Sequence, residues 1–418
     1  MLRRIAVALL LPAAAALANE TTTEIGGHTK LNATGQSYPS SSLFRDAVGS
    51  TAIDATGELR INLGADNGPW SLTADWQLVA LHGDTFELGR SLPPGAELLF
   101  QTLPEDDRRL FDLTKVVTEG NDHALLHRLD RLAVGYTSEK TVLRLGRQAL
   151  SWGNGLFYAP MDLVNPFDPA AVDTEYKAGD DMLYLQYLRD NGDDVQAAYV
   201  ARRDLLSGDT DADDATAAVK YHGFAGELEY DLLLAENYGD AVVGLGGGRS
   251  IGGAILRGDV VVTDTDIDTY LQLVANLTYS WVWGGKNMSG AIEYFYNGFG
   301  LRAGRYDLTA LANEPDLARR LGRGELFSLG RHYLAGSVLI EVTPLWTVTP
   351  TVLANVADPS ALIQVVTGFS LSDDMTLLGS INLPLGPDGS EFGGIPAGVP
   401  DRYLSGGPGL FAQFAWYF

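Results

Sequence analysis

Alternation between apolar and polar residues recurs along most of this chain. The segment 270–283 shows it most clearly, and one set of its alternate positions is apolar: Leu271, Leu273, Ala275, Leu277, Tyr279, Trp281 and Trp283. The other set includes Gln272, Asn276 and Ser280. Successive side chains of a β-strand point to opposite faces of a sheet, so this period of two predicts strands with one apolar face.

Eighteen segments of this kind are predicted, with turn residues between many of them. They are residues 26–37, 57–66, 69–82, 124–137, 140–150, 181–190, 194–203, 215–222, 225–236, 239–248, 252–262, 269–283, 286–297, 331–342, 345–356, 361–371, 374–384 and 409–418. The region 239–262 is rich in glycine, and the pairing register of its strands stays open. Alternation alone also fits a half-buried sheet of a soluble protein, so the connections have to distinguish the two.

Short and long connections alternate along the chain. Short turns are predicted near Asp66-Asn67-Gly68, Ser138-Glu139, Asn191-Gly192, Gly223-Phe224, Arg249-Ser250, Gly284-Gly285, Thr343-Pro344 and Ser372-Asp373. The intervening connections include all the long ones, 38–56, 83–123, 151–180, 204–214, 298–330 and 385–408. Long loops on one side only are typical of an outer-membrane barrel. We therefore predict an all-β fold, a transmembrane antiparallel β-barrel of about 18 strands with short periplasmic turns, long extracellular loops and both termini in the periplasm.

The end of the chain supports a membrane barrel. One side of the final strand carries Leu410, Ala412, Phe414, Trp416 and Phe418. An apolar face that ends in an aromatic residue suits a strand facing lipid, whereas such an edge strand in a soluble sandwich would invite aggregation. The segment resembles the closing strand of Gram-negative outer-membrane β-barrels, which finish on Phe after alternating apolar residues.

The start of the chain has the features of a secretory signal peptide. Met1-Leu2-Arg3-Arg4 is basic, residues 5–17 are apolar, and Ala16-Leu17-Ala18 suits cleavage before Asn19. No later stretch reaches about 18 uninterrupted apolar residues, which argues against membrane-spanning helices. We expect residues 1–18 to be a signal peptide and residues 19–418 to form a multi-pass barrel in the cell outer membrane.

Composition narrows the function classes. The chain has 53 Asp and Glu against 29 Lys and Arg, a formal net charge of −24, which argues against a nucleic-acid partner. The absence of cysteine excludes disulfides, thiolate metal sites and c-type haem. The acidic excess either keeps the long loops soluble or concentrates cations at a pore mouth. We expect no cofactor or metal; the expected partners are outer-membrane lipid and lipopolysaccharide and small hydrophilic solutes or ions, and the oligomeric state stays open.

The segment 143–169, LRLGRQALSWGNGLFYAPMDLVNPFDP, joins a basic strand end to a loop rich in glycine, proline and aromatic residues. Its start, LRLGRQ-x-x-x-W-G, resembles the strand exit of porin-type and alginate-export-type barrels. The resemblance implies a loop folded into the lumen as a constriction, which we assign to 151–180; the alternative is an ordinary external loop. Expected wall contacts are Trp152, Phe157, Tyr158 and Phe167, and expected water-facing residues are Asp162, Asp168 and Asp173.

Charged residues opposite predicted lipid-facing positions are candidates for lining the pore. They are Arg131, Arg144, Glu227, Glu229, Asp231, Glu293 and Glu341. A two-residue turn at Ser138-Glu139 would place Arg144 opposite Ala133, and Glu293 is predicted to lie opposite Asn276. Charges that line a water-filled pore set its selectivity, so this largely acidic set predicts a mild cation preference. The alternative is that these charges only hold loops in place.

An enzyme finds little support in the sequence. His123 and His127 share a strand face roughly 13 Å apart, as rim residues would, and not as a catalytic or metal pair. The acidic loop 209–214 has oxygen-ligand spacing without the closing Glu of a calcium loop, so it is expected to be a solvated loop or a weak divalent-ion site. The sequence thus favours a passive outer-membrane channel. The alternatives are an exporter of an anionic polysaccharide and a barrel that serves an outer-membrane complex as scaffold or enzyme.

Overall fold

The computed structural model describes residues 21–91, 103–205, 207–302 and 306–418. The predicted signal peptide, 1–18, lies outside these residues. Within them, nineteen strands form one sheet, and eighteen of these form the wall of a closed barrel. The wall strands are β1 (Thr22–Ser37), β2 (Thr51–Asn67), β3 (Trp70–Gly83), β5 (His123–Thr137), β6 (Thr141–Gln148), β7 (Asp180–Leu188), β8 (Asp194–Val200), β9 (Thr216–Ala225), β10 (Leu228–Asn237), β11 (Asp240–Ile251), β12 (Ala254–Asp264), β13 (Thr269–Trp283), β14 (Lys286–Asn297), β15 (His332–Thr343), β16 (Trp346–Asn355), β17 (Ser360–Ser372), β18 (Met375–Leu385) and β21 (Gly409–Tyr417).

Each wall strand pairs antiparallel with its neighbours, and the last strand closes the ring. β21 pairs with β18 on one side and with β1 on the other, from His28↔Tyr417 to Gln36↔Gly409. The N–H groups of Gly27 and Phe418 each donate to the other's carbonyl at 3.0 Å. The prediction of an all-β antiparallel barrel of about 18 strands is confirmed.

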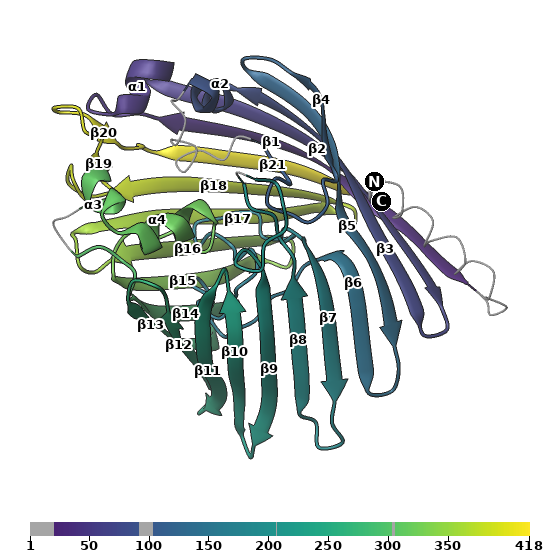
Figure 1. The fold of residues 1–418 in the computed structure, drawn as a ribbon. Coiled ribbons are helices and arrows are strands. Elements are labelled where there is room, and N and C mark those ends of the chain that lie inside the picture. Colours follow the sequence, from purple (N-terminus) through teal and green to yellow (C-terminus); the bar gives the residue numbers. More distant parts are fainter. Residues whose placement is uncertain (1–20, 92–102, 206, 303–305) are drawn as a thin grey trace.

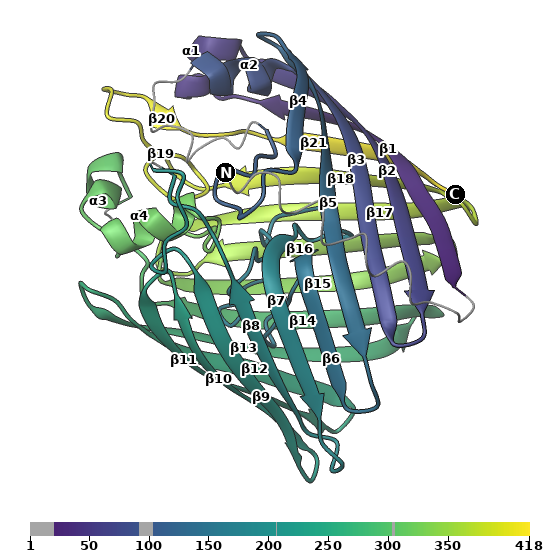
Figure 2. The same cartoon turned by 45° about the vertical axis from the view of Figure 1, so that its right-hand side comes forward.

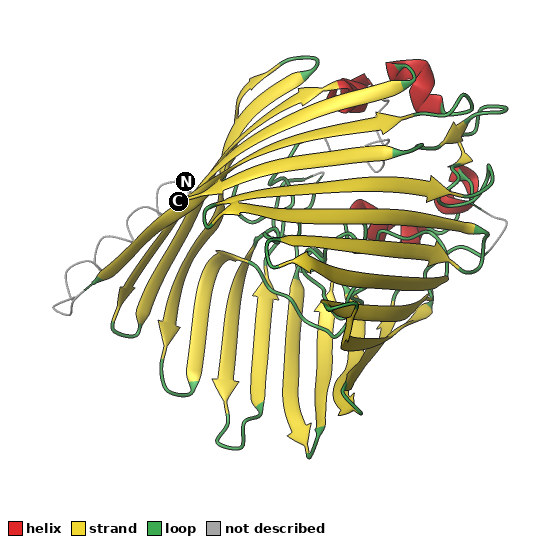
Figure 3. Ribbon diagram, turned by 180° about the vertical axis from the view of Figure 1, so that it is seen from behind, coloured by secondary structure: helices red, strands yellow, loops and turns green. Residues whose placement is uncertain are grey.

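The remaining elements lie in the long connections, at one end of the barrel, opposite the short hairpin turns (Figure 3). They are α1 (Leu43–Val48), α2 (Asp84–Ser91), β4 (Thr114–Glu119), α3 (Leu308–Ala312), α4 (Pro315–Gly322), β19 (Ile395–Pro396) and β20 (Tyr403–Leu404). Among the described residues, no helix has the length and apolar character that crossing a membrane requires.

The outer and inner faces of the wall differ as the period of two predicts. On β21, Leu410 and Trp416 are 61% and 44% exposed, whereas Gln413 between them is buried. The same alternation places Leu143 and Leu145 of β6 outward. An apolar outer belt over polar inward positions is the pattern of a transmembrane barrel, since lipid solvates the outside and the lumen is polar.

Two predicted turns are wrong by a few residues. The β9–β10 hairpin turns at Gly226-Glu227 and not at Gly223-Phe224. Gly223 lies within the strand, opposite Tyr230, whose ring occupies the space where a side chain would be. The β11–β12 hairpin turns at Gly252-Gly253, both with positive φ, and not at Arg249-Ser250, so this glycine-rich pair is longer than predicted and fully in register.

The strand β6 leaves the wall early. It pairs with β5 only as far as Leu132↔Arg147, and β4 takes over the same edge of β5 beyond that point. Between β4 and β7, the Phe111 N–H donates to Asp181 at 2.9 Å and its carbonyl accepts from Arg147 at 2.6 Å. A segment of the connection between β3 and β5 thus completes the wall, and the chain after Gln148 turns into the lumen.

Candidate functional site: the lumen and its inserted loop

The segment 149–179, called here the inserted loop, joins β6 to β7 through the inside of the barrel (Figure 2). Its first part meets inward-facing side chains of β8 and β12. The Trp152 indole donates to Gln196 at 2.6 Å, and Asn154 donates to Asp259 from its backbone at 2.7 Å and from its amide at 2.8 Å. These contacts fix the loop backbone against the wall.

Glu293 of β14 holds the next turn of the inserted loop. Its carboxylate accepts the backbone N–H groups of Leu156 at 2.6 Å, Phe157 at 3.0 Å and Tyr158 at 2.8 Å. Glu293 lies opposite Asn276, as predicted, and Asn276 also donates to it at 3.2 Å. The residue points inward but is only 1% exposed, so its charge anchors the loop and does not face the water of the lumen.

Glycines on the inner face of β11 make room for the loop. A Cβ at Gly246 would lie 2.4 Å from Asp259 and 3.1 Å from the sulfur of Met161, and one at Gly244 would lie 3.0 Å from Met161. Met161 itself is completely buried. The alternate glycines of β11 are therefore the sequence signal for a docked loop, which the sequence reasoning treated only as an uncertain register.

Aromatic residues of the loop pack on the inner wall, with one exception. Trp152 is 6% exposed, and the Tyr158 ring stacks on Phe295 with centroids 4.6 Å apart. Phe157 packs against the same group of wall residues. Phe167, expected to pack on the wall, is 37% exposed.

The second part of the loop runs to the opposite side of the barrel. Gln364 of β17 donates to the Ala170 carbonyl at 2.8 Å. Asp173 accepts from Gln413 of β21 at 2.7 Å and from Lys30 of β1 at 2.6 Å. Asp173 was expected to face water, but its side chain is only 29% exposed and is paired with Lys30. Burial acts to raise the pKa of Asp173, but the hydrogen bonds from Lys30 and Gln413 outweigh it and lower the pKa.

A buried ion pair joins three stretches of the inserted loop. The Lys177 amine contacts both oxygens of Asp162, at 2.6 and 2.7 Å, the Ser151 hydroxyl at 3.0 Å and the Leu150 carbonyl. The prediction that Asp162 faces water is wrong, since its side chain is 9% exposed. Burial raises the pKa of Asp162 to about 6, although Lys177 opposes the shift. Asp168, by contrast, is exposed as expected.

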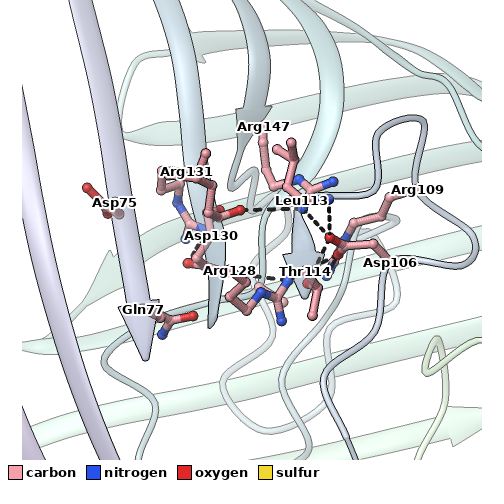
Figure 4. A network of polar contacts seen from close by, with 12 residues as sticks. Asp75, Gln77, Asp106, Arg109, Leu113, Thr114, Arg128, Asp130, Arg131 and Arg147 are labelled. Atoms are coloured by element: carbon pink, nitrogen blue, oxygen red, sulfur yellow. Dashed lines mark hydrogen bonds and ion pairs between the residues drawn. The ribbon is translucent and has the colours of Figure 1, made fainter. Parts of the chain in front are cut away.

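Inward-facing arginines and aspartates form a continuous network on β2, β3, β5, β6 and β7 (Figure 4). Arg60 contacts Asp75 at 3.1 Å and Asp130 at 2.8 Å, and Arg131 contacts Asp130 at 2.7 Å. A β-bulge against β3 lets the adjacent Asp130 and Arg131 both point inward. Arg131 is thus on the inner wall, as predicted, but its charge is paired.

Arg147 extends this network to the point where β6 leaves the wall. It is fully buried and pairs with Asp106 at 2.8 Å and Asp181 at 2.9 Å. Asp106 comes from the long connection before β4, and the hydrogen bonds from Arg147 and Arg109 hold its pKa far below its usual range despite burial. The sequence indicates neither a role for Arg147 nor its pairing with Asp106, because the two residues lie far apart along the chain.

Within the part of the chain that the structure describes, Arg144 differs from Arg60, Arg131 and Arg147 in having no carboxylate partner. It lies opposite Gly135 and not Ala133, because the turn holds two residues more than the predicted Ser138-Glu139 dipeptide. A shift of two residues keeps the same face, and Arg144 lies over the ring of inward-facing Tyr184 at 4.7 Å. Among the described residues, no carboxylate lies within ion-pair distance of Arg144.

The predicted acidic residues are divided between lumen and periplasmic rim. Glu227 is in the β9–β10 turn, 83% exposed and 3.7 Å from Arg249, so its assignment to the pore wall is wrong. Asp231 is buried and pairs with Lys220 at 3.2 Å. Glu229 and Glu341 are exposed at inward positions near the periplasmic ends of β10 and β15.

In the described part of the chain, the histidines and acidic residues form no metal-binding cluster. No group of three or more His, Asp or Glu side chains there is arranged to hold a metal ion. His123 is exposed at the start of β5, beside Asp122 at 2.8 Å. The residues that organise the lumen are instead the anchors that pair loop and wall, which the sequence could not bring together: Lys30, Arg60, Asp106, Arg147, Lys177 and Asp259.

Comparison with solved structures identifies the class of fold. The chain is similar to OccAB3 of Acinetobacter baumannii with a TM-score of 0.53 at 8% identity, covering 95% of this chain and 99% of that one. It is similar to a BenF-like porin from Pseudomonas fluorescens Pf-5 with a TM-score of 0.51 at 8% identity, covering 95% and 98%. OccK2 (OpdF) of Pseudomonas aeruginosa, solved in complex with glucuronate, gives 0.51 at 10% identity, covering 95% and 98%.

These similarities define a porin-like barrel of the outer-membrane type. No protein-family model matches the chain, and no curated protein matches it. At identities of 8 to 10% the likeness is one of fold, so residue roles have to come from this chain itself.

Proposed function

We propose that this chain is a porin-type channel for the passive diffusion of small hydrophilic solutes or ions, narrowed by the inserted loop. The observation that carries the proposal is the loop's attachment to the wall on several sides: β8 and β12 hold its start, β14 its first turn, and β17, β21 and β1 its second part. A closed barrel of this size encloses a wide polar lumen, and a segment fixed across that lumen sets the width of the path.

A mild cation preference is part of the proposal. Four of the wall cations, Lys30, Arg60, Arg131 and Arg147, are each within ion-pair distance of a carboxylate, so their fields are largely cancelled. Exposed carboxylates remain on the loop and near the periplasmic mouth, at Asp168, Glu229 and Glu341. An ion in the pore responds most strongly to such unpaired charges, because they act at short range.

Planar-bilayer recording tests the channel and its selectivity together. Purified, refolded protein should give stepwise conductance, and removal of residues 156–174 should enlarge each step because the crossing segment is gone. In a potassium chloride gradient the reversal potential should show a modest cation preference. A clear anion preference would refute the selectivity assignment, and an unchanged step size in the shortened variant would place the constriction elsewhere.

An acidic solute is the second candidate, and one residue favours it. Arg144 is inward-facing and has no carboxylate partner among the described residues, so it can receive a carboxylate from a solute. The similar OccK2 was solved with glucuronate. Export of a long anionic polysaccharide fits less well, because an anchored crossing segment obstructs a polymer. A scaffold or enzyme role would show no conductance in the same recording.

A further inference from the structure

Two of the long connections meet next to the inserted loop. One joins β14 to β15 and contributes residues 306–331, and the other joins β18 to β21 through residues 386–408. Their short elements α3, α4, β19 and β20 gather at the same end of the barrel (Figure 2). Ile395 and Leu404 of the second connection pack in one apolar core with Leu326 of the first. The two stretches therefore form one packed unit, called here the cap.

Glu391 joins the two parts of the cap to each other and to the barrel wall. Its carboxylate accepts the backbone N–H of Leu329, from the other connection, at 2.7 Å. It also accepts from the Tyr333 hydroxyl of β15 at 2.6 Å and from the Asn355 amide of β16 at 2.7 Å. Desolvation raises the pKa of Glu391, although these three hydrogen bonds oppose the shift. One carboxylate thus satisfies donors from three separate stretches of the chain.

The cap contacts the inserted loop at two places, and the first is aromatic. Phe392, the residue after Glu391, packs against the wall cluster that Tyr158 and Phe157 of the inserted loop also join. The Tyr333 ring, whose hydroxyl binds Glu391, lies with its centroid 5.3 Å from that of Tyr158. Glu391 is therefore linked to the inserted loop through a single intervening side chain.

The second contact surrounds a small cavity of about 30 Å³ between the cap and the inserted loop. Arg320 and Glu325 of the cap line it on one side, and Pro160 and Asp162 of the inserted loop line it on the other. Arg320 is held there by Glu325 at 2.6 Å and by Asp240 of β11 at 2.7 Å. The cap thus has wall contacts at β11, β15 and β16, and it lies against the inserted loop between them.

We propose that the cap limits the size of the solutes that enter from outside the cell, and that Glu391 is the positioning residue that keeps the cap against the inserted loop. The cap is built from connections at the end of the barrel that carries the long loops, so an entering solute meets it before the inserted loop. This inference rests on the proposed channel function and goes beyond it, because it assigns an outer size limit to residues outside the inserted loop. Without the Glu391 carboxylate, three donors lose their acceptor, which loosens the cap and changes no wall pairing.

Uptake by intact cells tests the cap, because added solutes then enter only from outside. Cells without general porins of their own would express the parent or a variant and be given neutral mono-, di- and trisaccharides. Glu391→Ala should raise the ratio of trisaccharide to monosaccharide uptake several-fold. Asp388→Asn is the matched control, an exposed carboxylate of the same connection, and should keep the ratio of the parent. A barrel that is merely destabilised would lower the uptake of all three sugars together and leave the ratio unchanged.

A milder variant decides the question if Glu391→Ala fails to fold, as judged by heat-modifiable migration. Tyr333→Phe removes the hydroxyl that donates to Glu391 and keeps the ring beside Tyr158. It should raise the same uptake ratio, by less than Glu391→Ala. A folded Glu391→Ala, or in its place a folded Tyr333→Phe, with the ratio of the parent would overturn the role of the cap. Folded parent protein that admits none of the three sugars would instead refute the channel proposal, and the size limit with it.

Discussion

Glu293 offers the sharpest single perturbation of the inserted loop. Its two carboxylate oxygens accept one N–H, from Leu156, on one side and two, from Phe157 and Tyr158, on the other. Glu293→Gln keeps the shape of the side chain and replaces one oxygen by an NH2 group. In either orientation of the amide, its NH2 group faces at least one of these backbone N–H groups, which then has no acceptor.

The loss of docking free energy follows from these bonds. A backbone N–H left without an acceptor costs about 1–3 kcal/mol. Each remaining hydrogen bond now goes to a neutral amide and no longer to a carboxylate, which weakens it by roughly 1 kcal/mol. The total is about 3–5 kcal/mol for this turn of the loop. Since about 1.4 kcal/mol is a factor of ten, the ratio of docked to undocked turn should fall by more than about a hundredfold.

Single-channel recording measures the consequence. Glu293→Gln should give larger or strongly flickering conductance, while heat-modifiable migration of the barrel stays that of the parent because no wall pairing is changed. Glu341→Gln is the matched control, since Glu341 is an exposed inward glutamate with one side-chain bond, to Asn287 at 2.7 Å. Identical mean current and noise in Glu293→Gln and the parent would show that the loop does not depend on this anchor.

Four further outcomes are expected. Deleting Phe418 removes two bonds of the β1–β21 seam and an outward aromatic, so the heat-modifiable folded form should decrease in outer-membrane fractions; an unchanged yield would argue against the closing role. Gly246→Val should displace Met161 and Asp259, weaken loop docking by about 1–3 kcal/mol and raise conductance, whereas Gly35→Ala, with open space around it, should change nothing. Asp168→Asn should move the reversal potential toward anions, and no movement would exclude Asp168 from the passage. The pKa of Asp162, raised to about 6 by burial, means that the docked loop binds a proton more readily than a loop in water. Docking therefore strengthens as pH falls from 7 toward 5, and current noise should decrease over that range in the parent but not in Asp162→Asn.

Strand pairing was largely readable from the sequence because it depends on local patterns. A strand with one lipid-facing side shows period-two alternation over ten or more residues, and hairpin turns carry glycine or asparagine at fixed places. The misplaced turn at Gly223 shows the limit of such signals. That glycine is required by the Tyr230 ring across the ladder, and a cross-strand neighbour is not visible in the local sequence.

The direction of a charged side chain was also predictable, but its partner was not. Arg131, Arg144 and Glu293 point inward as their strand parity requires. Whether each charge reaches water depends on segments far away in the chain. Glu293 is covered by residues 156–158, and Arg131 is paired with Asp130 only because a bulge turns both side chains inward. At these residues, the charges that were predicted to set the selectivity of the pore instead hold the inserted loop or pair with the wall.

The sequence by itself determined the class of this protein, because its alternating strands and one-sided long loops specify a membrane barrel. Those features follow from periodicity and turn chemistry, which act between neighbouring residues. Only the tertiary structure decided the course of the inserted loop, its closure at Lys177 and the burial of Asp162. Such contacts join residues on opposite sides of the lumen, and their free energy depends on desolvation and distance, which no local pattern encodes.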